Sequence, residues 1–500
     1  MKTMPTVDLA RNRLFNKDKA VIALSLLLVF IWVTWTTAWD TGLYGDNVEQ
    51  FVWVHSLEWG YQKHPPMPTW LLGAAIHLIG PHSWLTNGLA AICFATTGWL
   101  TWLIARNLYS EKIANTAIIL WTLQQCFSVS AQIYNHNTVL VMFMAATVYA
   151  VLRTAHSKIP NTWWFSAGVF SGCAMLSKYQ AALPLFILLV TVLATNKRSN
   201  RALSIGLASA GLGFAIVFSP HVYWAISNNF PTLRYASGAL ESGGLTRRVA
   251  WVLTFFVNQV RMVFPLLAVI FLCWIVSRTR QKSESVQQST ASDDDFYTAK
   301  SAWMWCLVWA PVLLVIVLSL ISASQLRNHW GVQLFQFLPI WIAWRWRHSR
   351  QLQWCFLIPA AIVVHALGFT YYAVKQSNAN AVQAERRADS AYPASQIAKA
   401  ALTHWGQHTA CPLKIIAGDF EAGMASAFMK DFPLVYGGIQ ATPWIKQEQI
   451  LQYGMLYIAD MNSVLPADAI AVKKWFLSPS TPSSGKYLQL AVRLPLHPCN

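Results

Sequence analysis

A short acidic segment near the start of the chain holds the residues best suited to chemistry. Four carboxylates lie between the first long apolar run and the Pro-Pro step at residues 65 and 66: Asp40, Asp46, Glu49 and Glu58. Asp46 and Glu49 are three residues apart, a spacing that places both carboxylates on one face of a helix. A short loop crowded with acidic residues suggests a site at the membrane surface; a simpler account is that Asp46 caps the helix, with Glu49 completing a capping-box-like pair.

A second group of polar residues lies much later, in residues 324–330. This segment holds Arg327, His329 and Trp330 between two apolar runs. Arg can hold a phosphate through two parallel hydrogen bonds, and Trp can stack on a sugar ring or anchor a chain at the membrane interface. Arg327 therefore fits a phosphate or sugar-carboxylate ligand, and it fits an interfacial anchor equally well.

The elements that position these residues are mostly membrane helices. Of the 500 residues, 55% are hydrophobic and 11% are charged, whereas soluble proteins carry roughly a quarter charged residues. Apolar runs long enough to cross about 30 Å of hydrocarbon recur through the first three-quarters of the chain. None of the acidic residues lies in a predicted span, which argues against a proton-coupled carrier because such carriers relay protons through intramembrane carboxylates.

The sequence predicts an all-α polytopic membrane domain with about eleven transmembrane helices. The stretch Met67–Ile79 is assigned to a juxtamembrane helix on the outer surface, since counting it as a crossing would destroy the excess of Lys and Arg on the cytoplasmic side. That one-sided distribution also argues against nucleic acid as the partner of a chain with net charge +17. The predicted spans are 20–38, 84–105, 113–129, 138–152, 162–176, 180–195, 202–221, 250–277, 301–322, 331–344 and 352–372.

This arrangement divides the chain into segments with different surroundings. Residues 1–19 form a cytoplasmic segment, residues 20–372 the membrane domain with its first outer loop at 39–83, and residues 278–300 a polar cytoplasmic linker loop. Residues 373–500 are predicted to form a small α/β domain, which the odd number of spans places outside. Strand-like stretches there (413–417, 433–436, 455–458) alternate with helical ones (394–404, 420–428).

Only two of the eight cysteines, Cys411 and Cys499, fall in the predicted outer domain. An oxidising compartment would allow them to form a disulfide bond. Two unpaired thiols are the alternative.

Two motifs resemble those of the membrane glycosyltransferases of the GT-C fold. The first is Asp-Asn-Val-Glu-Gln at residues 46–50 followed by Lys-His-Pro-Pro at 63–66, and the second is Leu-Ser-Lys-Tyr at 176–179. Together they are similar to the branch that contains dolichyl-phosphate-mannose–protein mannosyltransferases and bacterial enzymes that add aminoarabinose to lipid A. The residues of the first motif are most similar to those of lipopolysaccharide-core galacturonosyltransferase-like proteins of glycosyltransferase family 39 type. The resemblance covers roughly residues 20–350.

The resemblance implies roles for individual residues. Asp46 corresponds to the family's first-loop acid, which deprotonates or orients the acceptor hydroxyl, and Glu49 would assist it or cap the helix. Lys63 corresponds to the lysine that contacts the carrier phosphate, and Lys178 matches the lysine of the second motif. His64, Tyr179, His329 and Trp330 are candidates for substrate binding, with Arg327 as a further phosphate ligand.

The resemblance also implies the partners and the compartment. The donor would be a polyprenyl-phosphate sugar, the acceptor lipopolysaccharide or another envelope glycan, and membrane lipids would surround the spans of a bacterial inner-membrane protein. Its N-terminus would be cytoplasmic and its C-terminal domain periplasmic. No cofactor is certain, and a divalent cation stays possible because some related enzymes use one, although His55, His64 and Asp46 do not have tight ligand spacing.

The chain departs from the family at one informative position. Gln62 precedes Lys63 where the family usually has an acid, and His64 separates Lys63 from Pro65. Because that acid is thought to meet the amino group of aminoarabinose, a neutral or acidic donor sugar is favoured. The expected function is an inverting glycosyltransferase. The alternatives are a protein O-glycosyltransferase and a non-enzymatic lipid or polysaccharide transporter.

Overall fold

The structure is a computed structural model of the whole chain. It describes residues 6–195, 199–238, 243–279, 302–322, 325, 331–347, 353–382, 390–438, 440–461, 463–476 and 487–497. The chain divides into two compact units. Unit one comprises Met1–Val33, Ala91–Ala131 and His136–Phe369, and unit two comprises Thr34–Ala90, Gln132–Asn135 and Thr370–Asn500.

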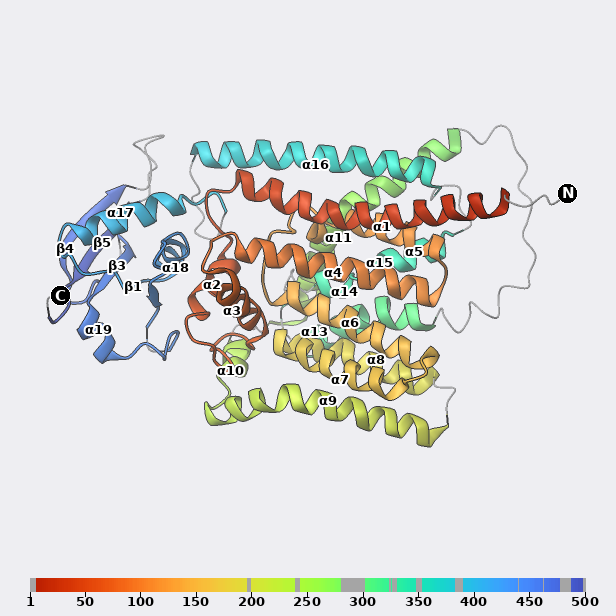
Figure 1. Cartoon of the computed structure of the whole chain (residues 1–500), viewed down its shortest axis with the longest axis horizontal. Helices are drawn as coiled ribbons and strands as arrows, with labels where there is room; N and C mark the ends of the chain where they lie inside the picture. The colour runs from red at the N-terminus through yellow and green to blue at the C-terminus, as the bar shows by residue number, and fades with distance from the viewer. Residues whose placement is uncertain are drawn as a thin grey trace. The chain divides into compact units, whose positions relative to one another are not determined.

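Unit one is built from helices, and the predicted membrane domain is confirmed in outline. Within the described residues, seven helices of the chain are long and apolar enough to cross a membrane: Lys19–Trp39, Leu85–Leu108, His136–His156, Asn200–Ser227, Leu245–Val276, Ala302–Ile321 and Trp354–Asn378. They fall on seven of the eleven predicted spans, so the count of eleven stays a prediction. In the labels of Figure 1 these helices lie in α1 (Thr6–Trp39), α4 (Leu85–Leu108), α6 (His136–His156), α9 (Asn200–Ser227), α11 (Leu245–Thr279), α13 (Ala310–Ser322) with the π-helical turn Trp305–Trp309, and α16 (Trp354–Val382).

The other predicted spans correspond to shorter helices. The span at 113–129 is α5 (Glu111–Thr122) followed by a turn, and the spans at 162–176 and 180–195 are α7 (Pro160–Ser177) and α8 (Ala182–Thr195). The span at 331–344 is interrupted, because α14 (Gly331–Leu334) and α15 (Leu338–Arg345) are separate helices. Met67–Ile79 forms α3 with the predicted bounds.

Small residues let α7 and α9 run side by side, as Figure 1 shows. A Cβ added at Gly168 would collide with the carbonyl group of Ala210, and one at Gly206 would collide with the indole of Trp164. Glycine therefore allows the two backbones to approach closely, which is how membrane helices pack when no hydrophobic effect drives them together.

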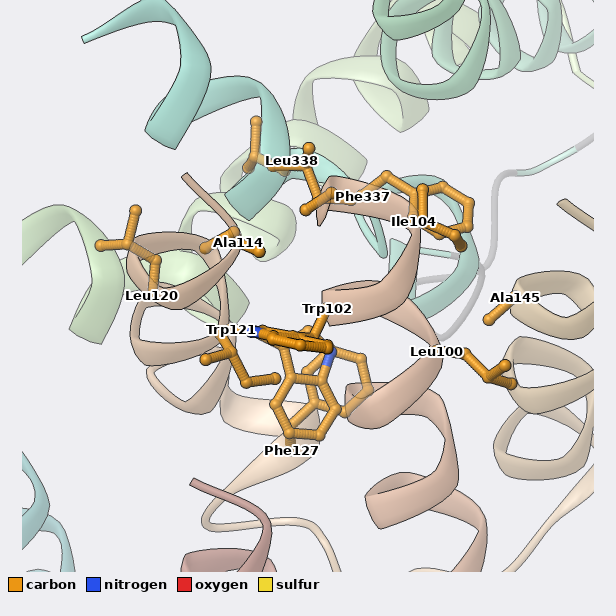
Figure 2. Packing of buried hydrophobic residues seen from close by; sticks show 14 of the residues in the cluster. Leu100, Trp102, Ile104, Ala114, Leu120, Trp121, Phe127, Ala145, Phe337 and Leu338 are labelled. Carbon is orange, nitrogen blue, oxygen red and sulfur yellow. The ribbon is translucent and has the colours of Figure 1, made fainter. Parts of the chain in front are cut away.

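The core of unit one lies around α4, α5 and the turn after α5 (Figure 2). The ring of Trp121 stacks on that of Phe127 with 4.1 Å between centroids. Nε1 of Trp102 donates to Oδ1 of Asn115 over 2.7 Å. The buried indole N–H thus has an acceptor, which burial of a polar group requires.

Unit two joins the first loop of the chain to a C-terminal α/β sheet. Its loop helices are α2 (Gly45–Trp53) and α3, and its C-terminal helices are α17 (Ala394–Gly406), α18 (Phe420–Ala427) and α19 (Gln447–Tyr453). The strands are β1 (Ile415–Ala417), β2 (Leu434–Tyr436), β3 (Met455–Asp460), β4 (Ile470–Phe476) and β5 (Tyr487–Arg493), in the order β2-β1-β3-β5-β4. β1 pairs in parallel with β2 and β3, and β5 pairs antiparallel with β3 and β4.

The predicted small C-terminal sheet with helices is therefore confirmed. Its periplasmic location stays a prediction, as does its boundary at residue 373, which α16 crosses because that helix continues to Val382. Cys411 is disulfide-bonded. Its predicted partner Cys499 lies outside the described residues.

Within unit two, α2 packs against α18 of the C-terminal segment. A Cβ added at Gly423 of α18 would lie 2.7 Å from Cγ1 of Val48 and 2.8 Å from Cγ2 of Val52. Beside this contact, the ring centroid of Phe432 lies 4.2 Å from that of His55 and 5.9 Å from that of Phe51. The C-terminal segment thus holds the helix that carries the candidate carboxylates.

Candidate functional site

The candidate site is built on α2. The helix begins at Gly45 after Tyr44, whose backbone is extended and whose side chain makes no capping hydrogen bond. Asp46 lies in the first turn, inside the helix. The capping hypothesis for Asp46 is therefore wrong, and its carboxylate is available for another role.

Asn47 fixes the position of α2 from its buried face. Its side-chain amide donates to Thr86 Oγ1 (3.1 Å), Asn87 Oδ1 (2.9 Å) and the carbonyl of Gln132 (3.2 Å). Its own oxygen accepts from the backbone N–H of Tyr134 at 3.0 Å. A buried amide with all these partners ties three segments of the chain together, so Asn47 positions the carboxylates beside it in the sequence.

The four carboxylates of the first loop have different surroundings. Asp40 Oδ1 accepts hydrogen bonds from Tyr372 Oη at 2.6 Å and Ser390 Oγ at 2.9 Å. Glu58 Oε1 accepts from Ser56 Oγ at 2.6 Å within its own turn. Both of these carboxylates therefore have structural roles.

Asp46 is exposed and is oriented by a single amide. Its Oδ2 accepts a hydrogen bond of 2.8 Å from Nδ2 of Asn135. The carboxylate of Asp46 is therefore accessible and is oriented by a neighbouring donor.

Glu49 instead pairs with Lys63. Lys63 Nζ lies 2.7 Å from Glu49 Oε1, and the two side chains are 44% and 20% exposed. Burial raises the pKa of Glu49 above its ordinary value, the charge and hydrogen bond of Lys63 oppose that rise, and the charge of Asp46 adds to it. The two carboxylates thus interact electrostatically, as their spacing predicts.

Aromatic packing holds the loop that carries Lys63. Tyr61 stacks on Trp53 with ring centroids 4.9 Å apart, and its hydroxyl donates to the carbonyl of Ser56 at 2.8 Å. His64 meets the edge of Trp53 at 6.2 Å. Burial raises the pKa of Tyr61, so this phenol stays protonated and is not a base.

Glu49 and Lys63 line a cavity of about 370 Å³, a size typical of small-ligand sites. One wall comes from the first loop: Gly45, Val48, Glu49, Val52, Trp53, Gln62 and Lys63. The other comes from the C-terminal segment: Gly418, Asp419, Phe420, Val435, Gly437 and Ala441. Neither Asp46 nor His64 is among the lining residues.

The second motif lies in unit one. Lys178 follows the last turn of α7, and its Nζ donates to Asn137 Oδ1 at 2.9 Å. Tyr179 Oη forms a hydrogen bond of 2.6 Å with Nε2 of the buried His221. Asn135 and Asn137, the partners of Asp46 and Lys178, are thus two residues apart in the sequence, at the start of α6.

Three predicted site residues, Arg327, His329 and Trp330, lie outside the described residues. Within the described part of the chain, no three His, Cys, Asp or Glu side chains lie together as a metal site.

Sequence reasoning missed several residues that form the site. Asn47 lies inside the Asp-Asn-Val-Glu-Gln motif, and Asn135 directly precedes α6. Gly418 and Asp419 follow directly after β1. That position was a usable signal, because ligands of α/β sheets bind outside the carboxyl ends of parallel strands.

Comparisons with known proteins place these features in context. Residues 63–224 match the family described as dolichyl-phosphate-mannose-protein mannosyltransferase. Lipid A galacturonosyltransferase RgtD of Rhizobium johnstonii is 21% identical over 323 residues, which cover 62% of this chain and 63% of RgtD. Lipopolysaccharide core galacturonosyltransferase RgtA of the same organism is 24% identical over 223 residues, 42% of this chain and 44% of RgtA. The chain thus spans less than two thirds of either relative.

Solved structures share the fold over nearly the whole chain. ArnT from Cupriavidus metallidurans bound to undecaprenyl phosphate matches with a TM-score of 0.63 and 12% identity, over 94% of this chain and 97% of ArnT. The apo form matches with a TM-score of 0.54 and 15% identity, over 96% and 98%. The likeness confirms the predicted fold and a multi-pass membrane protein.

Proposed function

The chain has the GT-C glycosyltransferase fold, and we propose that it is an inverting glycosyltransferase. It moves a sugar from a polyprenyl-phosphate donor to a cell-envelope acceptor, lipopolysaccharide core or lipid A, at the outer face of the bacterial inner membrane. The N-terminus is cytoplasmic and residues 373–500 are periplasmic. The acceptor is supported by RgtD and RgtA, which are named for lipid A and lipopolysaccharide core. The donor is supported by the structure of ArnT bound to undecaprenyl phosphate.

One observation carries the proposal: the ion pair of Glu49 and Lys63 in the 370 Å³ cavity. Transfer from a lipid phosphate needs a cation for the phosphate and a carboxylate for the acceptor proton. The first loop supplies both: Lys63, held by Glu49, is the cation, and Asp46, on the same helix α2 as Glu49, is the carboxylate for the proton. A transporter needs no such base in the loop that carries its cation.

Lys63 binds the donor phosphate in this mechanism. An ammonium group has three donors, so Nζ can keep its bond to Glu49 while it donates to a phosphate oxygen. Glu49 thereby aims the ammonium group and acts as a positioning residue. Lys178, by its place in the second motif, and Arg327, by its guanidinium group, are further candidates for phosphate binding.

Asp46 acts on the acceptor. Its carboxylate, oriented by Asn135, takes the proton of the acceptor hydroxyl as the oxygen attacks the anomeric carbon. The bond between that carbon and the phosphate oxygen breaks, the electron pair leaves with the polyprenyl phosphate, and the configuration inverts. A single displacement of this kind requires no carboxylate nucleophile, in contrast to a retaining glycosidase.

The remaining predicted residues bind substrate in this proposal. His64 lies next to Lys63 in the sequence, and Tyr179 follows Lys178. His329 and Trp330 complete the set, with Trp330 stacking on a sugar face.

Mass spectrometry of a deletion strain tests the function. Lipid A, core oligosaccharide and polyprenyl phosphates are compared in the strain without the protein and after return of wild-type protein or the Asp46→Asn variant. We expect one sugar to be absent from the glycan and to return only with wild type. An unchanged glycan profile would overturn the envelope-glycan acceptor and favour a protein acceptor. Full rescue by Asp46→Asn would instead favour a transporter.

A further inference from the structure

A second cavity, of about 240 Å³, lies at the carboxyl ends of β1, β2 and β3. Its lining residues are Gly418, Asp419, Glu421, Tyr436, Gly437, Ile458, Ala459, Asp460 and Ser463. Three of these, Gly418, Asp419 and Gly437, also line the cavity that holds Glu49 and Lys63. The two cavities are therefore neighbours with these residues between them.

The turn after β1 is fixed by its neighbours. Gly418 has a φ of +144°, and a Cβ there would collide with the carbonyl oxygen of Ile458 in β3. Its N–H donates to the carbonyl of Tyr436 at the end of β2, over 3.1 Å. Glycine is required at this position, and the turn holds Asp419 between the two cavities.

Asp419 is the shared residue with a side chain that can bind a ligand. It is exposed, and it does not cap α18 with its side chain. In the described part of the chain its carboxylate has no hydrogen-bond or ion-pair partner. Glu421 differs, because it is buried and accepts a bond of 3.2 Å from Tyr392 Oη.

The charges of the two cavities are complementary to different parts of a substrate. Lys63 is the cation among the lining residues of the first cavity. The lining residues of the second include three acids and no Lys or Arg. A phosphate or uronate would be repelled there, whereas a carboxylate can accept hydrogen bonds from the hydroxyl groups of a neutral sugar or from an amine.

We propose that the strand-end cavity is the acceptor subsite, and that Asp419 binds an uncharged or amine-bearing sugar of the acceptor glycan. This proposal rests on the proposed function and deepens it. Asp419 and Lys63 bind different substrates. The anionic donor phosphate binds at Lys63, and the acceptor sugar that lies beside the attacking hydroxyl binds at Asp419. The C-terminal domain is then a determinant of acceptor specificity.

The test measures two binding constants on the full-length protein in nanodiscs. The probes are dephosphorylated core oligosaccharide from the deletion strain, for the acceptor subsite, and undecaprenyl phosphate, for the donor site. Asp419→Asn should weaken oligosaccharide binding about tenfold, as loss of a hydrogen bond to a charged group does. Its affinity for undecaprenyl phosphate should stay within twofold of wild type.

Asp431→Asn is the matched control, because Asp431 is an exposed carboxylate of the same domain that lines neither cavity. Equal oligosaccharide affinity in Asp419→Asn and wild type would overturn the subsite. Weaker binding of undecaprenyl phosphate by Asp419→Asn would also overturn it, since Asp419 would then belong to the donor site. Failure of the proposed envelope-glycan function gives a different result, because wild-type protein itself would then not bind the oligosaccharide.

Charge selectivity gives a second readout. Wild-type protein should bind the dephosphorylated oligosaccharide more tightly than the phosphorylated one. In Asp419→Asn the difference between these two affinities should be smaller. A preference of wild type for the phosphorylated form would overturn the assignment of an uncharged or amine-bearing sugar.

Discussion

Nζ of Lys63 lies 2.7 Å from Oε1 of Glu49, and the two residues come from different elements, the loop before α3 and the helix α2. The pair is held from both sides. Asn47 ties α2 to neighbouring segments, and the stack of Trp53 on Tyr61 holds the loop. Preorganisation of this kind lets a phosphate meet a cation that is already in place.

Lys63→Met should lose affinity for undecaprenyl phosphate. Removal of a charged hydrogen-bond donor costs about 1.5–3 kcal/mol, which is roughly tenfold to a hundredfold in the dissociation constant. Thermophoresis with purified protein in detergent measures the dissociation constant for undecaprenyl phosphate. Lys399→Met is the control, because Lys399 is exposed on α17 and lines neither cavity. An equal affinity for both variants would remove Lys63 from the donor site.

The pH dependence of transfer should reflect the raised pKa of Glu49. Because burial raises this pKa above the ordinary 4.5, Glu49 becomes protonated at a higher pH than an ordinary glutamate as the pH falls. A protonated Glu49 cannot pair with the Lys63 ammonium group, so the rate should fall on the acid side at a pH above 4.5.

Initial rates across the pH range with wild type and Glu49→Gln check this expectation. Glu49→Gln should be slower and should lack that acid limb. His55 cannot supply it, since burial lowers its pKa to about 4. An unchanged limb in Glu49→Gln would show that another group controls it.

Asp46→Asn should lower the rate of transfer by about 10²–10⁴-fold, the usual contribution of a general base. Binding of undecaprenyl phosphate should be unchanged, because Lys63 keeps its partner Glu49. Asn135→Ala should have a smaller effect on the rate, since it removes the donor that orients the carboxylate and leaves the base itself. Single-turnover rates give the comparison, and wild-type rates in Asp46→Asn would rule out Asp46 as the base.

Gly423→Ala should destabilise the protein, because the new methyl group would lie under 3 Å from atoms of Val48 and Val52. β-Branched side chains have little rotamer freedom to move away, and overpacking costs about 1–3 kcal/mol. Thermal unfolding followed by tryptophan fluorescence should show a lower Tm, together with slower transfer as α2 shifts.

Gly406→Ala is the matched control for this substitution. A Cβ added at Gly406 meets no atom within 4 Å, and alanine in a helix is more stable than glycine by roughly 0.5–1 kcal/mol. Its Tm should therefore hold or rise. A lower Tm in both variants would contradict the argument from close contact.

Cys411 should be found in a disulfide-linked peptide with Cys499. Peptide mapping without reductant should yield one cross-linked peptide that separates into two after reduction. A partner other than Cys499, or a free Cys499 thiol, would contradict the pairing predicted from the sequence.

Local sequence signals located many elements accurately. α3 has its predicted bounds because Pro65 and Pro66 precede it and Gly80 ends it with a φ of +91°. α17, α18, β1, β2 and β3 all fall on predicted stretches. β4 and β5 were missed, since they depend on antiparallel pairing with each other and with β3. The break between α14 and α15 was also missed, because apolar composition alone does not reveal an interruption.

The sequence by itself determined the membrane character of the chain and the gathering of carboxylates and a lysine in the first loop. Hydrophobic composition and the spacing of Asp46, Glu49 and Lys63 are local properties, and local properties can be read from one sequence. Only the tertiary structure decided which partner each of these side chains has: Lys63 pairs with Glu49, and Asp46 accepts a hydrogen bond from Asn135. Only it brought Asp419 to the cavity that Glu49 and Lys63 line. Contacts between residues distant in the sequence depend on packing of whole elements, and no local pattern encodes them.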